Sequence, residues 1–237
     1  MSLLKQCLIE LLSVTVSKYF MIVFKNVSKR YPDGYVALNN IDLTVDSGEM
    51  VFLTGHSGAG KSTLLKLISA IERPTSGTIA ISGQNIARLK LGAIPYLRRK
   101  IGFIFQDHKL LFDRNAFNNV LLPLQISSFD SKTVASRVRA ALDKVGLLKK
   151  EKSMPIALSG GERQRLCIAR AIVHRPNILI ADEPTGNLDL EYARDIMALF
   201  TSFNQVGVTV LIATHDASLL EDTQHRILLL KQGKLAV

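Results

Sequence analysis

The chain has 237 residues, of which 47% are hydrophobic and 21% are charged, and its formal net charge is +10. This composition is ordinary for a globular protein and excludes disordered and fibrous chains. The length predicts one domain, or one domain with a sizeable insertion. A basic surface favours phosphates, anionic lipid headgroups or nucleic acid, and the charge alone does not choose among them.

The two cysteines, Cys7 and Cys167, form no CxxC pair and have no metal-ligand spacing. We therefore expect free thiols in a reducing compartment. No apolar run reaches the 18 residues that a transmembrane helix needs, so none is predicted.

The first twenty residues differ from the rest of the chain. Leucines recur there at helical spacing and predict a short amphipathic helix; they are Leu4, Leu8, Leu11 and Leu12. Lys5 and Glu10 interrupt the apolar stretch, so a secretory signal is not expected. We interpret residues 1–20 as an extension outside the folded domain.

From Met21 onward the pattern becomes regular. Apolar alternation and short apolar runs predict strands at residues 21–27, 41–45, 50–53, 78–81, 178–181 and 208–213. Helices are predicted at residues 63–70, at 190–204 and through most of 112–175. Pro123 and Pro155 are expected to break the last of these regions. Strands that alternate with helices indicate a parallel-sheet core, here interrupted by a helical insertion.

A glycine-rich loop follows the strand predicted at residues 50–53 and precedes a helix. Gly55-x-x-x-x-Gly60-Lys61-Ser62 fits the P-loop pattern at every fixed position. The glycines let successive backbone N–H groups face one anion, and the helix adds its positive end. Lys61 is expected to reach the β- and γ-phosphates, and Ser62 to hold Mg²⁺.

Two acids end the strand predicted at residues 178–181. Asp182 at the strand end suits coordination of Mg²⁺ through water. Glu183 can polarise an attacking water as a general base. A strand that ends in Asp-Glu is a weak signal alone and gains strength only beside the P-loop.

A Ser-Gly-Gly run precedes another long predicted helix. Ser159, Gly160 and Gly161 offer a hydroxyl, bare N–H groups and a helix N-terminus, which together make a second anion-binding device. By pattern alone, Ser159 could also be simply the N-cap of that helix.

These segments, in this order, resemble the ATP-binding subunits of ABC proteins from residue 21 to about 235. The Leu-Ser-Gly-Gly-Glu run at residues 158–162 is a signature of that family. The resemblance implies an α/β P-loop NTPase (RecA-like) fold with a parallel-sheet core, an antiparallel β-subdomain and a helical insertion. Residues 21–237 would form the ATPase domain. Its core would span about 21–106 and 172–237, and its helical subdomain about 107–171.

The same resemblance implies roles for single residues. Gln106 would touch Mg²⁺ and water, Asp189 would lie in the loop that crosses a dimer interface, and His215 would contact the γ-phosphate. Tyr31 would stack on adenine, with Tyr35 as the rival candidate. The other expected nucleotide contacts are Gly55, His56, Ser57, Gly58, Ala59, Gly60, Lys61, Ser62, Thr63, Ser159, Gly160 and Gly161. The implied ligands are ATP and Mg²⁺, with Ser62, Gln106 and Asp182 around the metal.

A narrower resemblance is to the FtsE-type ATPases of bacterial cell division. It rests on the loop and helix at residues 54–68, on Pro95-Tyr96-Leu97-Arg98-Arg99 and on Phe105-Gln106-Asp107-His108. It implies a homodimer that forms on ATP binding, an inner-membrane partner similar to FtsX and control of cell-wall hydrolases at the division site. Other division proteins are further candidate partners, and the subunit would be peripheral at the cytoplasmic face of the membrane.

Two other functions remain open at this point. One is the ATPase of a lipoprotein-release or macrolide-type exporter, which differs only in fine resemblance. The other is a DNA-repair or chromosome ATPase, which the positive charge would suit. The stretch between Lys61 and Asp182 contains no heptad array and no cysteine cluster, so no nucleic-acid partner is expected.

Overall fold

The computed structural model describes residues 20–127, 129–186, 188–216, 219–220 and 223–236. The predicted N-terminal amphipathic helix and Cys7 lie outside the described residues. Cys167 is a free, buried thiol. Within the described part of the chain, no helix is both long and apolar enough to cross a membrane.

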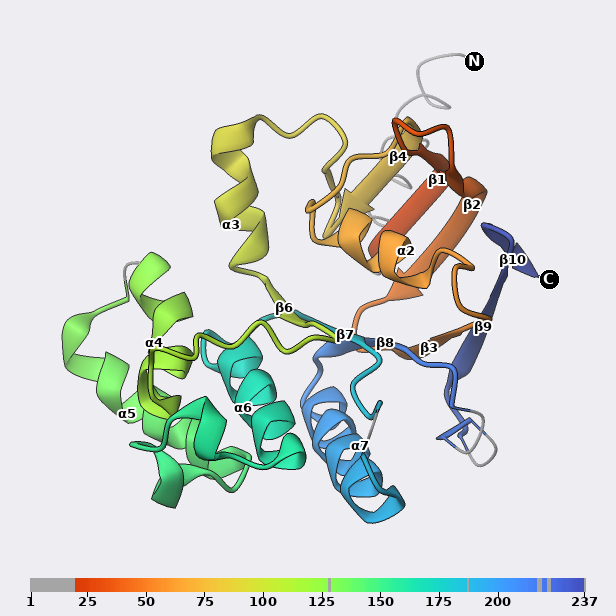
Figure 1. The fold of residues 1–237 in the computed structure, drawn as a ribbon. Helices are drawn as coiled ribbons and strands as arrows, with labels where there is room; N and C mark the ends of the chain where they lie inside the picture. Colours follow the sequence, from red (N-terminus) through yellow and green to blue (C-terminus); the bar gives the residue numbers. More distant parts are fainter. Residues whose placement is uncertain (1–19, 128, 187, 217–218, 221–222, 237) are drawn as a thin grey trace.

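Two sheets organise the fold (Figure 1). An antiparallel sheet has the strand order β2-β1-β4-β5, and a six-stranded sheet has the order β10-β9-β3-β8-β7-β6. The larger sheet is parallel except for its edge strand β10, which runs antiparallel to β9. The strands are β1 (Phe20–Arg30), β2 (Val36–Asp46), β3 (Met50–Thr54), β4 (Ser76–Ile81), β5 (Gln84–Asn85), β6 (Ile101–Ile104), β7 (Ile178–Asp182), β8 (Thr209–Ala213), β9 (Arg226–Lys231) and β10 (Lys234–Ala236).

The helices connect and cover these sheets. They are α2 (Lys61–Ile68), α3 (Ile94–Arg98), α4 (Ala116–Ile126), α5 (Ser131–Lys144), α6 (Gly160–Ile172) and α7 (Leu190–Gln205). Short 3-10 turns occur at Leu91–Ala93, Leu148–Lys150 and Pro155–Ala157. Helices α4, α5 and α6 form a group to one side of the sheets, while α7 lies beneath the parallel sheet (Figure 1).

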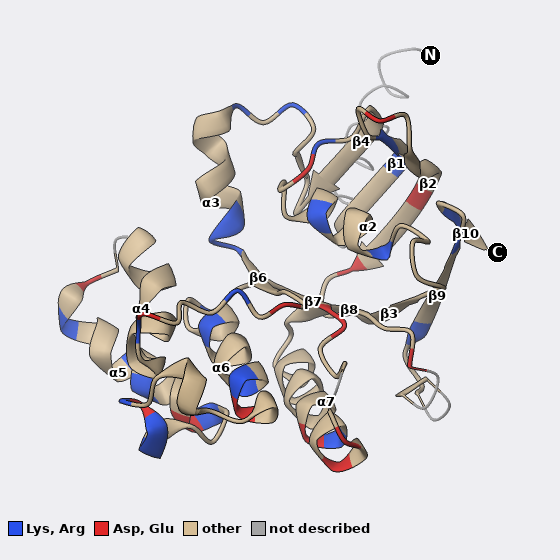
Figure 2. Ribbon diagram, viewed as in Figure 1, with Lys and Arg blue, Asp and Glu red and all other residues tan. Residues whose placement is uncertain are grey.

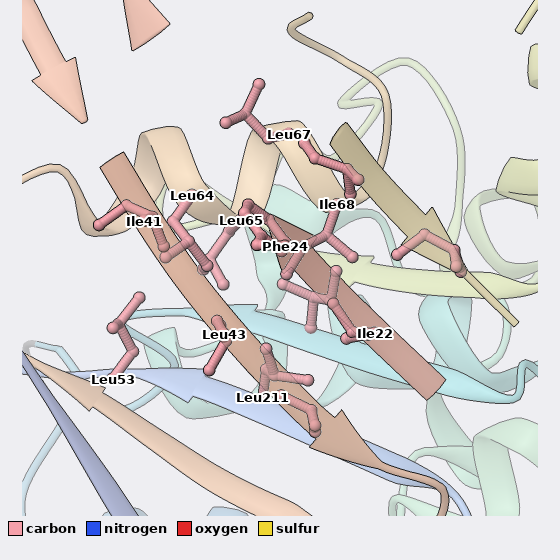
Figure 3. Packing of buried hydrophobic residues seen from close by; sticks show 14 of the residues in the cluster. Ile22, Phe24, Ile41, Leu43, Leu53, Leu64, Leu65, Leu67, Ile68 and Leu211 are labelled. Atoms are coloured by element: carbon pink, nitrogen blue, oxygen red, sulfur yellow. The ribbon is translucent and has the colours of Figure 1, made fainter. Parts of the chain in front are cut away.

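The parallel sheet is buried on both faces, which explains its continuous apolar runs. Successive residues of a strand point to opposite faces. In β3, Val51 and Leu53 join one core cluster, whereas Met50 and Phe52 join the other. The first cluster holds α2 between the parallel sheet and the antiparallel sheet (Figure 3). The second contains buried residues of α4, α5, α6 and α7.

One sequence expectation is wrong: Pro123 does not break a helix, because it lies inside α4. An interior proline costs about 3 kcal/mol. Leu124, the next residue, is fully buried in the second core cluster, and burying a leucine stabilises by about 1.5–3 kcal/mol. The helix then ends at Ile126, only three residues later. Pro155 begins a 3-10 turn, where its missing N–H costs little.

Candidate functional site

The glycine-rich loop joins β3 to α2 and curls because its glycines take left-handed conformations. Their φ angles are 146° at Gly55, 76° at Gly58 and 107° at Gly60. Gly60 is the N-cap of α2, and no side chain caps that helix end. The first N–H groups of the helix lack partners within it and are available to an anion.

Two of these glycines are also required by space. A Cβ atom on Gly55 would overlap the carbonyl oxygen of Leu230, and one on Gly60 would overlap that of Ala37. Gly58 has open space around it. The loop is therefore pressed against β9 and β2 at its two ends and open in its middle.

The topology of the parallel sheet brings distant segments to this loop. Strands β3, β8, β7 and β6 are neighbours and run parallel, so their carboxyl ends meet at one edge. The loop follows β3, Gln106 follows β6, Glu183 follows β7 and His215 follows β8. This arrangement gathers the residues that the sequence predicted as phosphate-binding and catalytic.

Lys61, Glu183 and His215 form a chain of contacts across the site. Lys61 Nζ donates to the carbonyl of Gly55 at 2.7 Å and lies 3.7 Å from Glu183 Oε1. His215 Nδ1 lies 2.8 Å from Glu183 Oε2. The Glu183 side chain is only 10% exposed and its backbone φ is 51°, a left-handed value that is uncommon for a non-glycine residue.

These residues line a pocket of about 580 Å³. Its wall consists of Tyr35, His56, Ser57, Gly58, Ala59, Gly60, Lys61, Ser62, Thr63, Gln106, Glu183 and His215. With loop amides and Lys61 on its wall, the pocket has the chemistry of a polyphosphate site.

Asp182 ends β7 and immediately precedes Glu183, which lines the pocket. It is buried, and its Oδ1 atom has no hydrogen-bond partner among the described residues. Burial raises the pKa of this carboxyl, while a hydrogen bond from Ser62 opposes the rise. An unpartnered buried carboxylate oxygen beside a hydroxyl is costly alone and suits a bound cation.

The two candidate adenine-stacking tyrosines lie together beside the loop. Their rings stack with centroids 6.4 Å apart. The Tyr31 hydroxyl lies 3.3 Å from Thr63 Oγ1, and the Tyr35 hydroxyl donates to the Gly58 carbonyl at 2.7 Å. Tyr35 lines the pocket and Tyr31 does not. The rival tyrosine of the sequence analysis therefore has a direct place in the pocket wall.

Ser159, Gly160 and Gly161 do not line this pocket. Ser159 caps α6 in a capping box, in which Glu162 N donates to Ser159 Oγ and Ser159 N donates to Glu162 Oε2. A hydrogen bond from Lys150 holds the pKa of Glu162 below its usual value. The alternative interpretation of Ser159 as an N-cap is thus confirmed. A capped helix start can still bind the phosphate of a nucleotide that another chain holds.

Asp189 has a similar position at the start of α7, where its side chain accepts from Tyr192 N at 3.0 Å. Tyr192 in turn packs on Gly161, where a Cβ atom would lie 2.9 Å from the tyrosine ring. The starts of α6 and α7 therefore lie side by side. Acidic residues mark the end of β7 and occur on α7 together with Arg194, and Lys or Arg occur on α2, α3, α5 and α6, the last with Glu162 in its first turn (Figure 2).

Comparison with known proteins assigns the family and the fold. The ABC transporter family model matches residues 38–186, which include the loop, the Ser-Gly-Gly run and the Asp-Glu pair. The chain belongs to the ABC transporter family. It is an ATPase of the ABC type, and the predicted α/β fold with parallel and antiparallel sheets is confirmed.

Among curated relatives of this ABC ATPase, the cell division ATP-binding protein FtsE of Escherichia coli K12 is 56% identical over 215 residues, covering 91% of this chain and 97% of its own. FtsE of Bacillus subtilis is 43% identical over 213 residues, covering 90% and 93%. The predicted similarity to the FtsE type is therefore confirmed.

A solved ABC structure shows the same architecture. The dimeric post-hydrolysis state of the ATP-binding cassette MJ0796, bound to ADP and Pi, superposes with a TM-score of 0.85 at 35% identity. The match covers 92% of this chain and 97% of that chain. The described residues of this ABC ATPase thus have the fold of an ATP-binding cassette.

Proposed function

We propose that this chain is an ATP-binding and hydrolysing subunit that dimerises on ATP and drives a membrane partner similar to FtsX, regulating cell-wall hydrolases during division. The observation that carries the proposal is the split between its two anion-binding devices. The P-loop lines a pocket with Gln106, Glu183 and His215, whereas Ser159, Gly160 and Gly161 lie outside it. One chain therefore supplies one half of each of two nucleotide sites, and a second chain would supply the other halves.

The loop residues would hold the polyphosphate of ATP. The backbone amides at the start of α2 face the anion, and Lys61 would turn from the Gly55 carbonyl to the β- and γ-phosphates. Tyr31 would support adenine at the edge of the loop, with Tyr35 as the alternative. Replacing each tyrosine by leucine separately decides between them, because only the replacement of the stacking tyrosine should weaken ATP binding.

Asp182, Ser62 and Gln106 would hold Mg²⁺. The unpartnered Oδ1 atom of Asp182 and the nearby Ser62 hydroxyl fit a hard cation that prefers oxygen ligands. When bound, the ion would neutralise part of the phosphate charge. Ser62 and Asp182 meet because the helix after β3 begins beside the end of β7.

Glu183 would take the proton of the attacking water. Its carboxylate is fixed at the pocket wall by contacts with Lys61 and His215. His215 would donate to the γ-phosphate, and Gln106 would hold the water and the metal ligands in place. Positioned donors of this kind act on the charge that develops in the transition state.

A second chain would complete each site. Two copies paired head to tail would place Ser159, Gly160 and Gly161 of one copy on the ATP held by the P-loop of the other. Asp189 would lie at the same interface, because α6 and α7 begin side by side. The dimeric cassette MJ0796 is a solved precedent for pairing of this fold. ATP binding would favour the closed dimer and hydrolysis would release it.

A groove lined in part by Phe105, the chain neighbour of Gln106, would receive the membrane partner. It has a volume of about 520 Å³ and is lined by residues of α3, β6, α4 and α6. Phe103, Phe105, Leu122 and Ile126 give it an apolar floor, and Arg98, Arg99 and Arg170 make it basic. We place it between a core of about 21–106 and 172–237 and a helical subdomain of about 107–171. An apolar segment with acidic residues fits this groove.

The relatives' name supports a place in cell division. A partner similar to FtsX would hold the subunit at the cytoplasmic face of the inner membrane. The net charge of +10 would add attraction to anionic lipids.

The Glu183→Gln variant tests the ATPase half of the proposal. The amide keeps the shape of the side chain but cannot take a proton, so ATP should bind while hydrolysis falls at least about a hundred-fold. Size-exclusion chromatography with ATP should then show a dimer that is absent with ADP. Wild-type turnover by this variant would show that Glu183 is not the base.

Co-purification tests the partner. An FtsX-like protein from the same host should associate with the wild-type chain, and Leu122→Asp in the groove should abolish the association. Arg139→Ala, on the exposed surface of α5, is the control. Equal recovery with Leu122→Asp would place the partner elsewhere, and no association of the wild-type chain would contradict the FtsX-like assignment.

A further inference from the structure

The turn that follows Gln106 has an unusual backbone. His108 and Lys109 are consecutive non-glycine residues in the left-handed region, with φ angles of 61° and 48°. L-residues adopt this conformation at an energetic cost, so the surroundings must hold it in place. The local hydrogen bonds in the turn run from His108 N to Phe105 O at 3.1 Å and from Lys109 N to Asp107 O at 2.6 Å.

Helix α6 holds both carbonyls of this turn. Arg170 donates through Nη1 to Lys109 O at 2.7 Å and through Nη2 to His108 O at 2.5 Å. Cys167 lies one helical turn earlier on the same face, and its Sγ lies 3.3 Å from His108 O. Burial raises the pKa of Cys167 to about 12, which keeps its thiol protonated and able to donate.

The Arg170 guanidinium binds these two backbone carbonyls and no carboxylate among the described residues. The ion pairs found among the described residues do not include it, although it lies on a helix that also carries Arg165, which pairs with Asp195. A guanidinium has donors in a fixed fork, which matches two adjacent carbonyls as an ammonium cannot. The contact therefore has the geometry of a specific clamp.

The position of Arg170 joins three parts of the proposed machinery. Its side chain lines the basic groove with Leu122 and Ile126. Its helix begins at Gly160, beside the Ser159 cap. The turn that it holds starts directly after Gln106, which lines the nucleotide pocket.

We infer that Arg170 is a positioning residue that keeps Gln106 in register with the start of α6, so that events at the groove and the nucleotide pocket move the Ser159-Gly160-Gly161 segment together. The inference rests on the proposed ATP-driven dimer. Arg170 touches neither ATP nor water in this scheme. It acts through the backbone of residues 108 and 109.

The experiment compares Arg170→Ala, Arg170→Lys and the surface control Arg139→Ala. Arg139 is a suitable match because it is exposed on α5 and its guanidinium binds the side chain of Glu151 rather than backbone carbonyls. Each variant is measured for ATP affinity, for kcat and KM, and for hydrogen exchange of residues 105–111. Each is also combined with Glu183→Gln to measure ATP-driven dimerisation by analytical ultracentrifugation.

Arg170→Ala should bind ATP within about two-fold of wild type, while kcat and dimer affinity fall at least about ten-fold, because the variant loses two charge-assisted hydrogen bonds and one alone is worth about ten-fold. Exchange should accelerate at residues 105–111. The kcat and dimer affinity of Arg170→Lys should lie between those of wild type and Arg170→Ala, because one ammonium cannot reproduce the forked geometry of the guanidinium. Arg139→Ala should match wild type.

Two results would overturn the inference. The first is wild-type kcat and wild-type dimerisation in Arg170→Ala. The second is a loss of ATP affinity as large as the loss of kcat, together with faster hydrogen exchange throughout the chain, because this would mean that Arg170 has only a general structural role. The Glu183→Gln chain with intact Arg170 separates the two proposals. If it forms no dimer with ATP, the proposed function is wrong and this inference with it. If it does, the Arg170 variants alone decide.

Discussion

The carboxylate of Glu183 lies 2.8 Å from the Nδ1 atom of His215, and the two side chains differ sharply in exposure, at 10% and 69%. The glutamate is thus fixed in the wall of the pocket while the histidine reaches in from solvent. A neutral imidazole donates through one nitrogen only. His215 must therefore turn away from Glu183 before it can donate to a phosphate.

This relationship predicts the effect of His215→Ala. One positioned donor to developing charge is worth about a hundred-fold or more in rate. We expect kcat to fall about a hundred-fold while ATP affinity changes little, because the loop supplies most phosphate contacts. Stopped-flow binding and steady-state turnover separate the two quantities. A large loss of ATP affinity with unchanged kcat would assign His215 to binding instead.

Asp182 predicts a conflict between stability and activity. Burial raises its pKa in the folded chain, so between the unfolded and folded pKa values the folded state binds more protons. The free energy of unfolding therefore falls as pH rises through that window, and the cost persists at neutral pH. Asp182→Asn should raise the thermal midpoint at pH 7 and lose Mg²⁺-dependent turnover.

The pH series checks this prediction. The gain of Asp182→Asn over wild type should shrink as pH falls towards 3.8, the ordinary pKa of an aspartate. Added Mg²⁺ should stabilise wild type more at neutral pH than near pH 3.8, since the carboxylate must be ionised to bind. A less stable Asn variant at pH 7 would mean that Asp182 is stabilised by partners other than a metal.

The glycine loop offers a matched pair of substitutions. Gly58 and Gly60 both have positive φ angles, but a Cβ atom meets nothing within 4 Å at Gly58 and overlaps the Ala37 carbonyl at Gly60. Gly58→Ala should cost about 1–2 kcal/mol of unfolding free energy from backbone strain alone. Gly60→Ala should cost clearly more, because β2 must also move. Urea unfolding without nucleotide measures both, and equal costs would show that the contact with β2 relaxes freely.

The Ser159 cap separates stability from function. Removing an N-cap costs about 1 kcal/mol, whether in α6 through Ser159→Ala or in α5 through Asp130→Ala. Both variants should therefore lower the thermal midpoint to a similar extent. Only Ser159→Ala should also weaken ATP-driven dimerisation in the Glu183→Gln chain. Equal ATP-driven dimerisation in the two variants would reduce Ser159 to its capping role.

Local patterns explain how much of the fold was predictable. Three strands of the parallel core, β3, β7 and β8, and helix α7 matched their predicted positions, because these buried strands are short apolar runs and α7 has a clear helical period. Strands β5, β6, β9 and β10 were missed. β5, β6 and β10 have only two to four residues, and β9 carries a charge at each end. Pairing with neighbours, which no local pattern records, makes them strands.

The sequence by itself determined the P-loop, the Asp-Glu pair and the Ser-Gly-Gly cap, because the chemistry of each lies within a few consecutive residues. Only the tertiary structure decided that Gln106, Glu183 and His215 converge on one pocket, that Pro123 stays in a helix and that Arg170 clamps the turn after Gln106. Each of these depends on the packing of segments far apart in the chain. The order of parallel strands and the burial of α4 and α6 supply the free energy that fixes them.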